Sequence, residues 1–244
     1  LSHRAVHNPL QALRSDVQNM SHMQGHNLQV YSGMIAALDR SVGKVIAKLK
    51  ELEIYGKTLI IFTSDNGGAD YIELEDINKP YRGWKISFFE GGIRVPGIIY
   101  YKGVLEKSIS NQFFFSDDIL PTLLSAISYD KDINYFTGVD RWESLITNKI
   151  EDPKNVVTGN VIVKDERALF NDEWKMYYSH FVYDDNSKKT FELYNIQADP
   201  FELNDLSSDH PDIFNSMKKT LTEMPVVIDT PYINPVQSYL YGDR

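Results

Sequence analysis

Apolar residues recur at helical spacing between residues 27 and 52. Charged residues such as Lys44 and Lys48 fall mainly on other faces of the same helix. The apolar series lies three or four positions apart and comprises Val30, Met34, Leu38, Val42, Val45, Leu49 and Leu52. That spacing places the apolar side chains on one face of a helix. We therefore predict one long amphipathic helix that packs against a sheet.

A second pattern begins directly after this helix. Residues 58–63 (TLIIFT) are apolar and β-branched without interruption, as in a parallel strand that is buried on both faces. A helix that leads straight into such a strand is typical of doubly wound α/β folds. Residues 95–101 predict a further strand, residues 116–127 a helix, and residues 1–11 the end of a strand that turns into a loop. For residues 1–150 we expect an α/β domain with a mixed, mostly parallel sheet flanked by helices.

The last hundred residues change character. Short aromatic and β-branched runs at 155–163, 167–170, 175–182 and 190–196 are separated by turn residues, which predicts consecutive antiparallel strands. Residues 209–224 predict one helix, with a proline in its first turn and an apolar face. We assign residues 151–244 to a small α+β domain that carries an antiparallel sheet and a terminal helix.

Composition narrows the possible functions. The 244 residues carry a net charge of -9, which argues against nucleic acid as the main partner. No apolar run approaches the ~18 residues of a membrane span. The sequence contains no cysteine, which excludes disulfides and cysteine nucleophiles within it. Because the chain begins at Leu1, we expect a piece of a longer protein; one glycosylation sequon, Asn19-Met20-Ser21, fits a secretory route.

Candidate metal ligands stand at the end of the predicted strand 58–63. Asp65 and Asn66 follow it directly, and two glycines come next. Ligands bind beyond the carboxyl ends of strands in open α/β sheets, and hard oxygen donors suit calcium or magnesium. A strand followed by an ordinary Asn-Gly turn is the alternative interpretation.

Three more features carry possible chemistry. Arg82 and Lys85 can hold an oxyanion, although two solvated cations are the simpler interpretation. His7 precedes Asn8-Pro9, and a lone histidine in such a place is more often structural than catalytic. The stretch Glu90-Gly91-Gly92 by itself predicts only a turn.

The joint pattern of these motifs resembles the sulfatase family. Its parts are His7-x-Pro9, SDNGG at 64–68, PYRGWK at 80–85, FEGGIRVPG at 89–97, DDILPTL at 117–123 and ELYNIQADPFELNDL at 192–206. They occur in the family's order and extend over nearly the whole chain. AVHNPLQ and RGWKISFFEGG are most similar to the arylsulfatase B group. The resemblance implies an alkaline-phosphatase-like α/β fold.

The resemblance also implies roles for individual residues. Asp65 and Asn66 match the residues that bind a divalent ion, usually Ca²⁺ and less commonly Mg²⁺. Lys85 matches the lysine that contacts the sulfate. His7 matches the histidine that holds the sulfate and protonates the departing alcohol. The implied activity is hydrolysis of sulfate esters, of sulfated sugars above all, in a lysosomal or secreted protein.

The departures from the family pattern are equally informative. The family's nucleophile is a formylglycine made from Cys or Ser in a C/S-x-P-x-R motif, and this sequence has no such motif. We expect the nucleophile and further metal ligands in an upstream segment, the N-terminal part of the same sulfatase. Accordingly, we predict that this chain alone neither hydrolyses sulfate esters nor binds calcium tightly. Two alternatives remain open: a related metal-dependent phosphatase or phosphodiesterase, and a sulfatase-like binding protein without catalysis.

Overall fold

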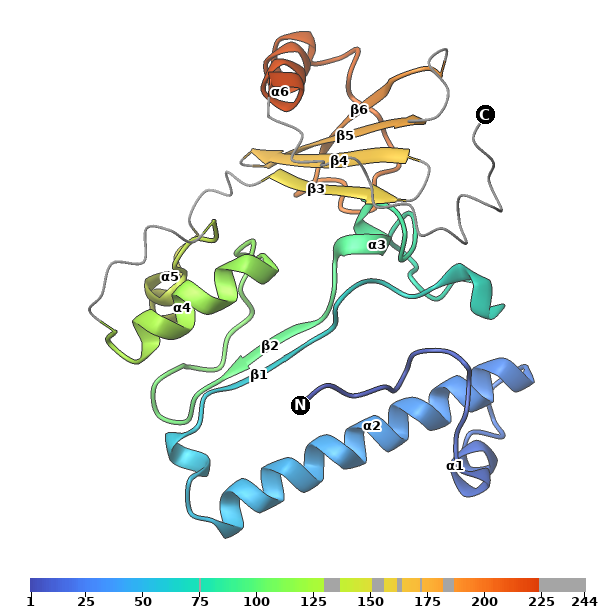
Figure 1. Ribbon diagram of the computed structural model, residues 1–244, viewed down its shortest axis with the longest axis vertical. Coiled ribbons are helices and arrows are strands. Elements are labelled where there is room, and N and C mark those ends of the chain that lie inside the picture. Colours follow the sequence, from blue (N-terminus) through green and yellow to red (C-terminus); the bar gives the residue numbers. More distant parts are fainter. Residues whose placement is uncertain are drawn as a thin grey trace, which may run out of the picture.

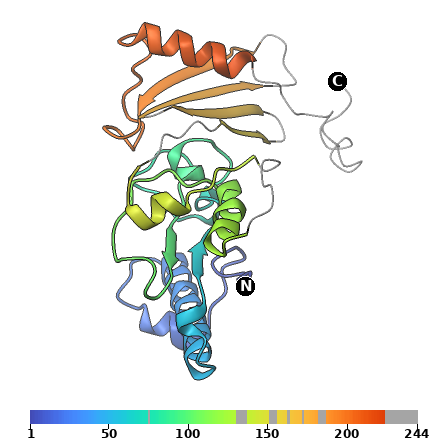
Figure 2. The same cartoon turned by 90° about the vertical axis from the view of Figure 1, so that its left-hand side faces the viewer.

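The computed structural model describes residues 1–74, 76–129, 137–150, 156–161, 164–171, 173–181 and 187–223, with backbone only for 156–161. The elements form successive tiers (Figures 1 and 2). A long helix lies at one end, a two-stranded ribbon and a set of loops follow, and a four-stranded sheet with its own helix closes the other end. No helix among these residues is long and apolar enough to cross a membrane.

The predicted long helix is confirmed as α2, His26–Glu51. A short helix, α1 (Arg14–Asn19), packs beside it. The carboxylate of Asp16 accepts two hydrogen bonds from the guanidinium of Arg40, at 2.8 and 2.7 Å. This paired contact fastens the N-terminal segment to α2. The strand end predicted at the start of residues 1–11 is wrong, because these residues contain no strand, whereas the predicted loop is present as turns and bends at residues 5–9.

The two strands that follow correct the predicted sheet. Strand β1 (Ile60–Thr63) pairs with β2 (Gly97–Tyr100) in antiparallel orientation, whereas we expected a mostly parallel sheet. A parallel partner requires a crossover of a dozen or more residues, usually helical. Among the described residues of the connection between β1 and β2, the helical elements are the 3₁₀ turn η2 (Asp70–Ile72) and the four-residue helix α3 (Glu90–Ile93), and no long crossover helix is present. The expected burial of β1 on both faces is also wrong, because its first three residues are half-buried and Thr63 is exposed. An apolar run does not specify the direction of the neighbouring strand.

The remaining short elements precede β1 or lie between β2 and the second sheet in the chain. They are η1 (Tyr55–Lys57) before β1, η3 (Ser116–Asp118), α4 (Ile119–Ala126) and α5 (Trp142–Thr147). Asp118 is fully buried, and its carboxylate accepts backbone N–H groups from Phe115 at 3.0 Å and Val139 at 2.7 Å. One side chain thus caps the helical segment and holds the chain that returns toward α5.

The predicted consecutive antiparallel strands of the C-terminal region are confirmed. Four consecutive strands pair antiparallel as β3-β4-β5-β6, with bounds Val156–Val161, Lys164–Asn171, Trp174–Phe181 and Thr190–Asn195. Helix α6 (Pro211–Glu223) follows. The predicted irregular tail from residue 225 lies outside the described residues.

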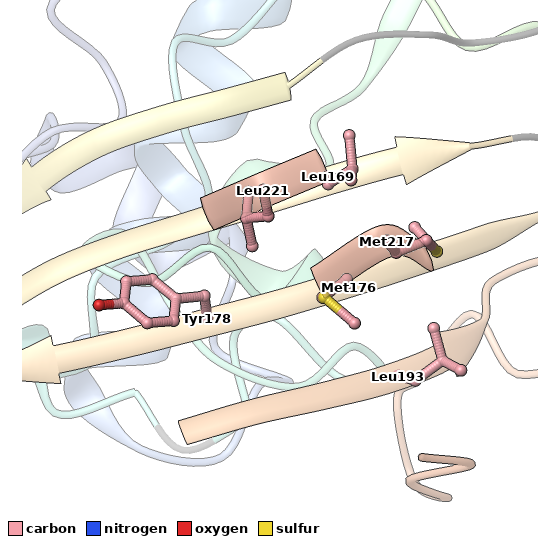
Figure 3. Packing of buried hydrophobic residues seen from close by; sticks show 6 residues of the cluster. All are labelled: Leu169, Met176, Tyr178, Leu193, Met217 and Leu221. Carbon is pink, nitrogen blue, oxygen red and sulfur yellow. The ribbon is translucent and has the colours of Figure 1, made fainter. Parts of the chain in front are cut away.

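Each face of this sheet buries a different partner, because side chains alternate along a strand. One face packs under α6, where Figure 3 shows the core residues Leu169, Met176, Tyr178, Leu193, Met217 and Leu221. The opposite face packs on α3 and the loops around it through Ala168, Phe170, Tyr177, Tyr194 and Ile196. The second face therefore joins the sheet to the loops that carry the candidate site.

Candidate functional site

Three glycine-containing loops are joined by backbone hydrogen bonds. Gly67 donates its N–H to the carbonyl of Gly92 at 2.8 Å, and Gly91 donates to Arg82 at 2.7 Å. Lys85 donates its backbone N–H to the carbonyl of Gly68 at 3.1 Å. The SDNGG, RGWK and EGG motifs, distant from one another in sequence, therefore form one hydrogen-bonded unit, which we call the loop cluster.

Glycine is required in the loop cluster by lack of space. A Cβ on Gly67 would lie 1.8 Å from the carbonyl oxygen of Gly91, and a Cβ on Gly92 would lie 2.0 Å from that of Ser87. Real Cβ atoms do not approach backbone oxygen this closely. The double glycines of the sequence thus permit backbone to pack directly on backbone.

Asn78 fastens the same unit, and sequence reasoning missed it. Its Oδ1 accepts the N–H of Gly68 at 2.7 Å. Its Nδ2 donates to the carbonyl of Gly68 at 2.9 Å and to that of Gly83 at 3.4 Å. An asparagine between two motifs, two residues before a proline, gave no signal of its own, because asparagine is common in any loop.

His7 and Lys85, 78 residues apart in sequence, are brought into contact. The Nε2 of His7 lies 3.1 Å from the Nζ of Lys85. The Nδ1 of His7 lies 2.7 Å from the carbonyl oxygen of Asn8. Because a carbonyl only accepts, Nδ1 carries the hydrogen, which leaves the lone pair of a neutral imidazole on Nε2. The lysine ammonium can then donate to Nε2, so that the exposed ring and the half-buried lysine lie in contact at the surface.

Asp65 and Asn66 directly follow β1, as predicted. Asp65 is exposed and Asn66 is half-buried. The hydroxyl of Ser64 donates to Asp65 Oδ1 at 3.4 Å and to the carbonyl of Asn66 at 3.2 Å. They stand in the loop cluster within three residues of Gly68, the backbone partner of Lys85.

The donor atoms of this turn fit a hard cation by type and not by number. Calcium takes six to eight oxygen ligands, of which a carboxylate and an amide supply only a few. Across the residues that the structure describes, no three His, Cys, Asp or Glu side chains gather as possible metal ligands. Asp65 and Asn66 can therefore hold one side of such an ion, and other ligands would have to complete it.

Arg82 serves the attachment of the loop cluster to the sheet. Its guanidinium donates to Glu192 at 2.8 Å and to the hydroxyl of Tyr194 at 2.6 Å, and it lies 3.8 Å over the ring of Phe89. The Tyr194 hydroxyl in turn donates to Glu192. Burial, and next the hydrogen bond to Glu192, raise the pKa of Tyr194. The hydroxyl thus stays protonated, and Arg82 forms a structural ion pair with Glu192 and is not a solvated cation without a partner.

Comparison with known proteins agrees with this picture. The sulfatase family profile matches residues 2–129, just over half of the chain. Arylsulfatase J of Mus musculus is 26% identical in an alignment that covers 91% of this chain and 44% of that protein. An N-acetylgalactosamine-6-O-sulfatase of Bacteroides thetaiotaomicron is 25% identical over 77% of the chain. The chain spans less than half the length of these relatives, which it matches in their C-terminal part.

A solved structure extends the likeness to the fold. The crystal structure of Ps i-CgsB in complex with k-i-k-neocarrahexaose superposes with a TM-score of 0.79 and 26% identity. The superposition covers 90% of this chain and 48% of that one. The fold is thus that of the corresponding part of sulfatases, although the described residues contribute only small antiparallel sheets and a few helices to it. With its motifs, its loop cluster and this profile match in agreement, the chain belongs to the sulfatase family.

Proposed function

We propose that this chain supplies one side of the active site of a sulfuric ester hydrolase. The observation that carries the proposal is the 3.1 Å contact between His7 Nε2 and Lys85 Nζ, where the Lys85 backbone is bonded to Gly68, two residues after Asn66. A cationic lysine and an imidazole converge there although 78 residues separate them. When Nε2 of His7 carries a proton, both side chains donate, and two neighbouring donors suit an anionic group with several oxygens, as a sulfate ester is.

The two side chains have complementary chemical tasks in this proposal. Cleavage of a sulfate ester breaks the S–O bond and leaves negative charge on the departing alcohol oxygen. The ammonium of Lys85 stabilises that charge by a charge-assisted hydrogen bond. When Nε2 of His7 carries a proton, the imidazole can give it to the alcohol as a general acid. The Nδ1–H···O=C bond to Asn8 keeps the ring oriented for that transfer.

The proposed site includes a divalent cation, Ca²⁺ in preference to Mg²⁺, held on this side by Asp65 and Asn66. When bound, the cation would supply electrostatic stabilisation of the sulfate oxygens. The nucleophile and the remaining ligands would come from the N-terminal part of the same sulfatase. We include a lysosomal or secreted location in the proposal on family resemblance.

The proposed substrates are sulfate esters of sugars. Two comparisons support this choice: one relative is named for an N-acetylgalactosamine 6-sulfate activity, and one structural neighbour was solved with a neocarrahexaose. The net charge of -9 is consistent with a local cationic site in an otherwise acidic protein, and it disfavours broad binding of polyanions such as nucleic acid.

Sulfate binding and turnover test the proposal separately. In the isolated chain, titration with sodium sulfate followed by NMR should shift the His7 imidazole and Lys85 signals, whereas 4-nitrocatechol sulfate should not be hydrolysed. Calcium should bind no more tightly than about 1 mM by calorimetry, because two side chains make a partial site. Joined to a segment that supplies the nucleophile, the chain should hydrolyse sulfated sugars. There, Lys85→Ala or His7→Ala should lower kcat about 10²- to 10⁴-fold.

Matched substitutions control for charge and for general damage. Lys79→Ala removes a lysine from the same loop region that is 68% exposed and pairs only with Asp76 among the described contacts. His22→Ala removes an exposed histidine. Both variants should keep turnover within about twofold of wild type. Equal losses in Lys79→Ala and Lys85→Ala, or full activity in His7→Ala, would contradict the assigned roles.

A further inference from the structure

A buried charged cluster lies between the loop cluster and the C-terminal sheet. Lys175 on β5 has a side chain with 0% exposure, and its Nζ lies 2.8 Å from Glu90 Oε1 and 2.8 Å from Glu202 Oε1. Glu202 Oε2 accepts the backbone N–H of Glu90 at 2.6 Å. Glu90 Oε2 accepts from Arg94 at 3.2 Å. Lys175 and the two carboxylates are thus buried together, and Arg94, whose side chain is 46% exposed, pairs with Glu90 from the solvent side.

Burial of this cluster is unfavourable for stability because its charges lose their hydration. Removing charges from water carries a large desolvation penalty, and apolar residues of similar size often give equal or greater stability. Burial raises the pKa of Glu202 in spite of the neighbouring Lys175, which shows that desolvation outweighs the attraction for that carboxylate. The contribution of the cluster is therefore to hold neighbouring segments in one arrangement, because hydrogen-bonded charges fix position and direction where apolar contacts do not.

The charged cluster fixes the position of residues 90–92, which we call the EGG turn. Glu90 is the first residue of α3, and Gly91 and Gly92 follow it at once. Gly91 donates to the carbonyl of Arg82, and Gly92 accepts from Gly67. The turn consequently touches both the RGWK loop and the SDNGG loop.

The packing around the turn leaves no room for it to move alone. A Cβ on Gly91 would lie 2.4 Å from the carbonyl oxygen of Gly83, and one on Gly67 would lie 1.8 Å from that of Gly91. A shift of the EGG turn would therefore displace both neighbouring loops. Lys85 would move with them, because its backbone N–H is bonded to Gly68.

We propose that Lys175, together with Glu90 and Glu202, is a positioning residue that sets the distance between Lys85 and His7. The assignment rests on the proposed function and adds to it a residue from the C-terminal sheet. Lys175 itself does not touch the site; it acts through Glu90 and the EGG turn. A lysine on the sheet thereby determines where the loop cluster stands, and the sheet becomes part of the machinery that shapes the sulfate site.

The test uses a double substitution that keeps the charge balanced. Lys175→Met with Glu202→Gln removes one cation and one anion and leaves Glu90 paired with Arg94. In the ¹⁵N-labelled chain, exchange of the Gly91 and Gly67 amides should accelerate at least tenfold. The His7 imidazole ¹⁵N signals should shift as the contact with Lys85 is lost. The milder Glu202→Gln alone should give smaller changes in the same direction, and it keeps the test decisive should the double variant fail to fold.

A matched control lies on the other face of the same sheet. Arg167 pairs with Asp165 at 2.9 and 2.6 Å, and both residues are buried near α6. Arg167→Met with Asp165→Asn removes a similar charge pair and should leave the His7 signals and the exchange of Gly91 within about twofold of wild type. The assignment would be overturned if the His7 signals were unchanged both in the Lys175→Met, Glu202→Gln double variant and in Glu202→Gln alone. Equal shifts of the His7 signals in the Arg167→Met, Asp165→Asn control would also overturn it. These readouts require neither sulfate nor turnover, so their failure is distinct from failure of the proposed function.

Discussion

Replacement of Gly67 by alanine is the sharpest test of how the loop cluster is built. The added methyl group would lie 1.8 Å from the carbonyl oxygen of Gly91, 2.9 Å from its carbonyl carbon and 3.2 Å from the Cα of Gly92. All three neighbours are backbone atoms, so no side chain can rotate away. The oxygen has to retreat to at least 3.0 Å, a movement of roughly 1 Å for backbone that is itself hydrogen-bonded on both sides.

The expected loss of stability follows from two contributions. Overpacking in a tight interior costs roughly 1–3 kcal/mol. Separation of the two loops also strains or breaks the 2.8 Å bond from Gly67 N–H to Gly92, worth about 1 kcal/mol. We therefore expect Gly67→Ala to lower the free energy of unfolding by about 2–4 kcal/mol, a large part of the ~5–15 kcal/mol of a typical domain.

Urea unfolding followed by far-UV circular dichroism measures this loss, and Gly43→Ala is the matched control. Gly43 lies inside α2, where an added Cβ meets nothing within 4 Å. The same substitution there should raise the free energy of unfolding by roughly 0.5–1 kcal/mol, because alanine is the better helix former. The two glycines should thus respond with opposite signs. A Gly67→Ala midpoint equal to that of wild type would refute the packing described for the loops.

Two further predictions concern other parts of the fold. Leu193 is fully buried under α6, so Leu193→Ala should lower the free energy of unfolding in urea by about 2–5 kcal/mol. Leu203→Ala, at a side chain that is 73% exposed, should change it by less than ~0.5 kcal/mol. Similar losses in the two variants would contradict the assigned core. The hydrogen bond from Arg40 lowers the pKa of Asp16 below its ordinary value of 3.8. This contact stabilises the fold above the ordinary pKa and is lost as pH falls through the lowered pKa. Asp16→Asn should therefore flatten the acid decline of stability below about pH 4, and an unchanged decline would exclude this pair as a cause.

The motifs themselves could be recognised without a structure. His7, Lys85, Asp65 and Asn66 were identified from their spacing and from the family resemblance, and the structure places His7 against Lys85. Glu90, in contrast, looked like part of a simple turn. The structure shows that its carboxylate forms a buried ion pair with Lys175, 85 residues further along the chain, at 2.8 Å. A charged residue before two glycines in an apolar stretch is a weak signal, since solvated turns contain the same residues.

Sequence by itself determined the local elements, because each leaves a periodic trace. The 3.6-residue period identified α2, and alternating aromatic runs identified β4–β6 and their consecutive pairing. The direction of the β1–β2 pair, the contact of His7 with Lys85 and the burial of Lys175 were decided only by tertiary structure. Each depends on which segments, distant from one another in the sequence, meet in space. Neither periodicity nor residue type specifies those long-range contacts. The loop cluster shows the difference most directly: its glycines were visible in the sequence, and the carbonyl groups that make them necessary were not.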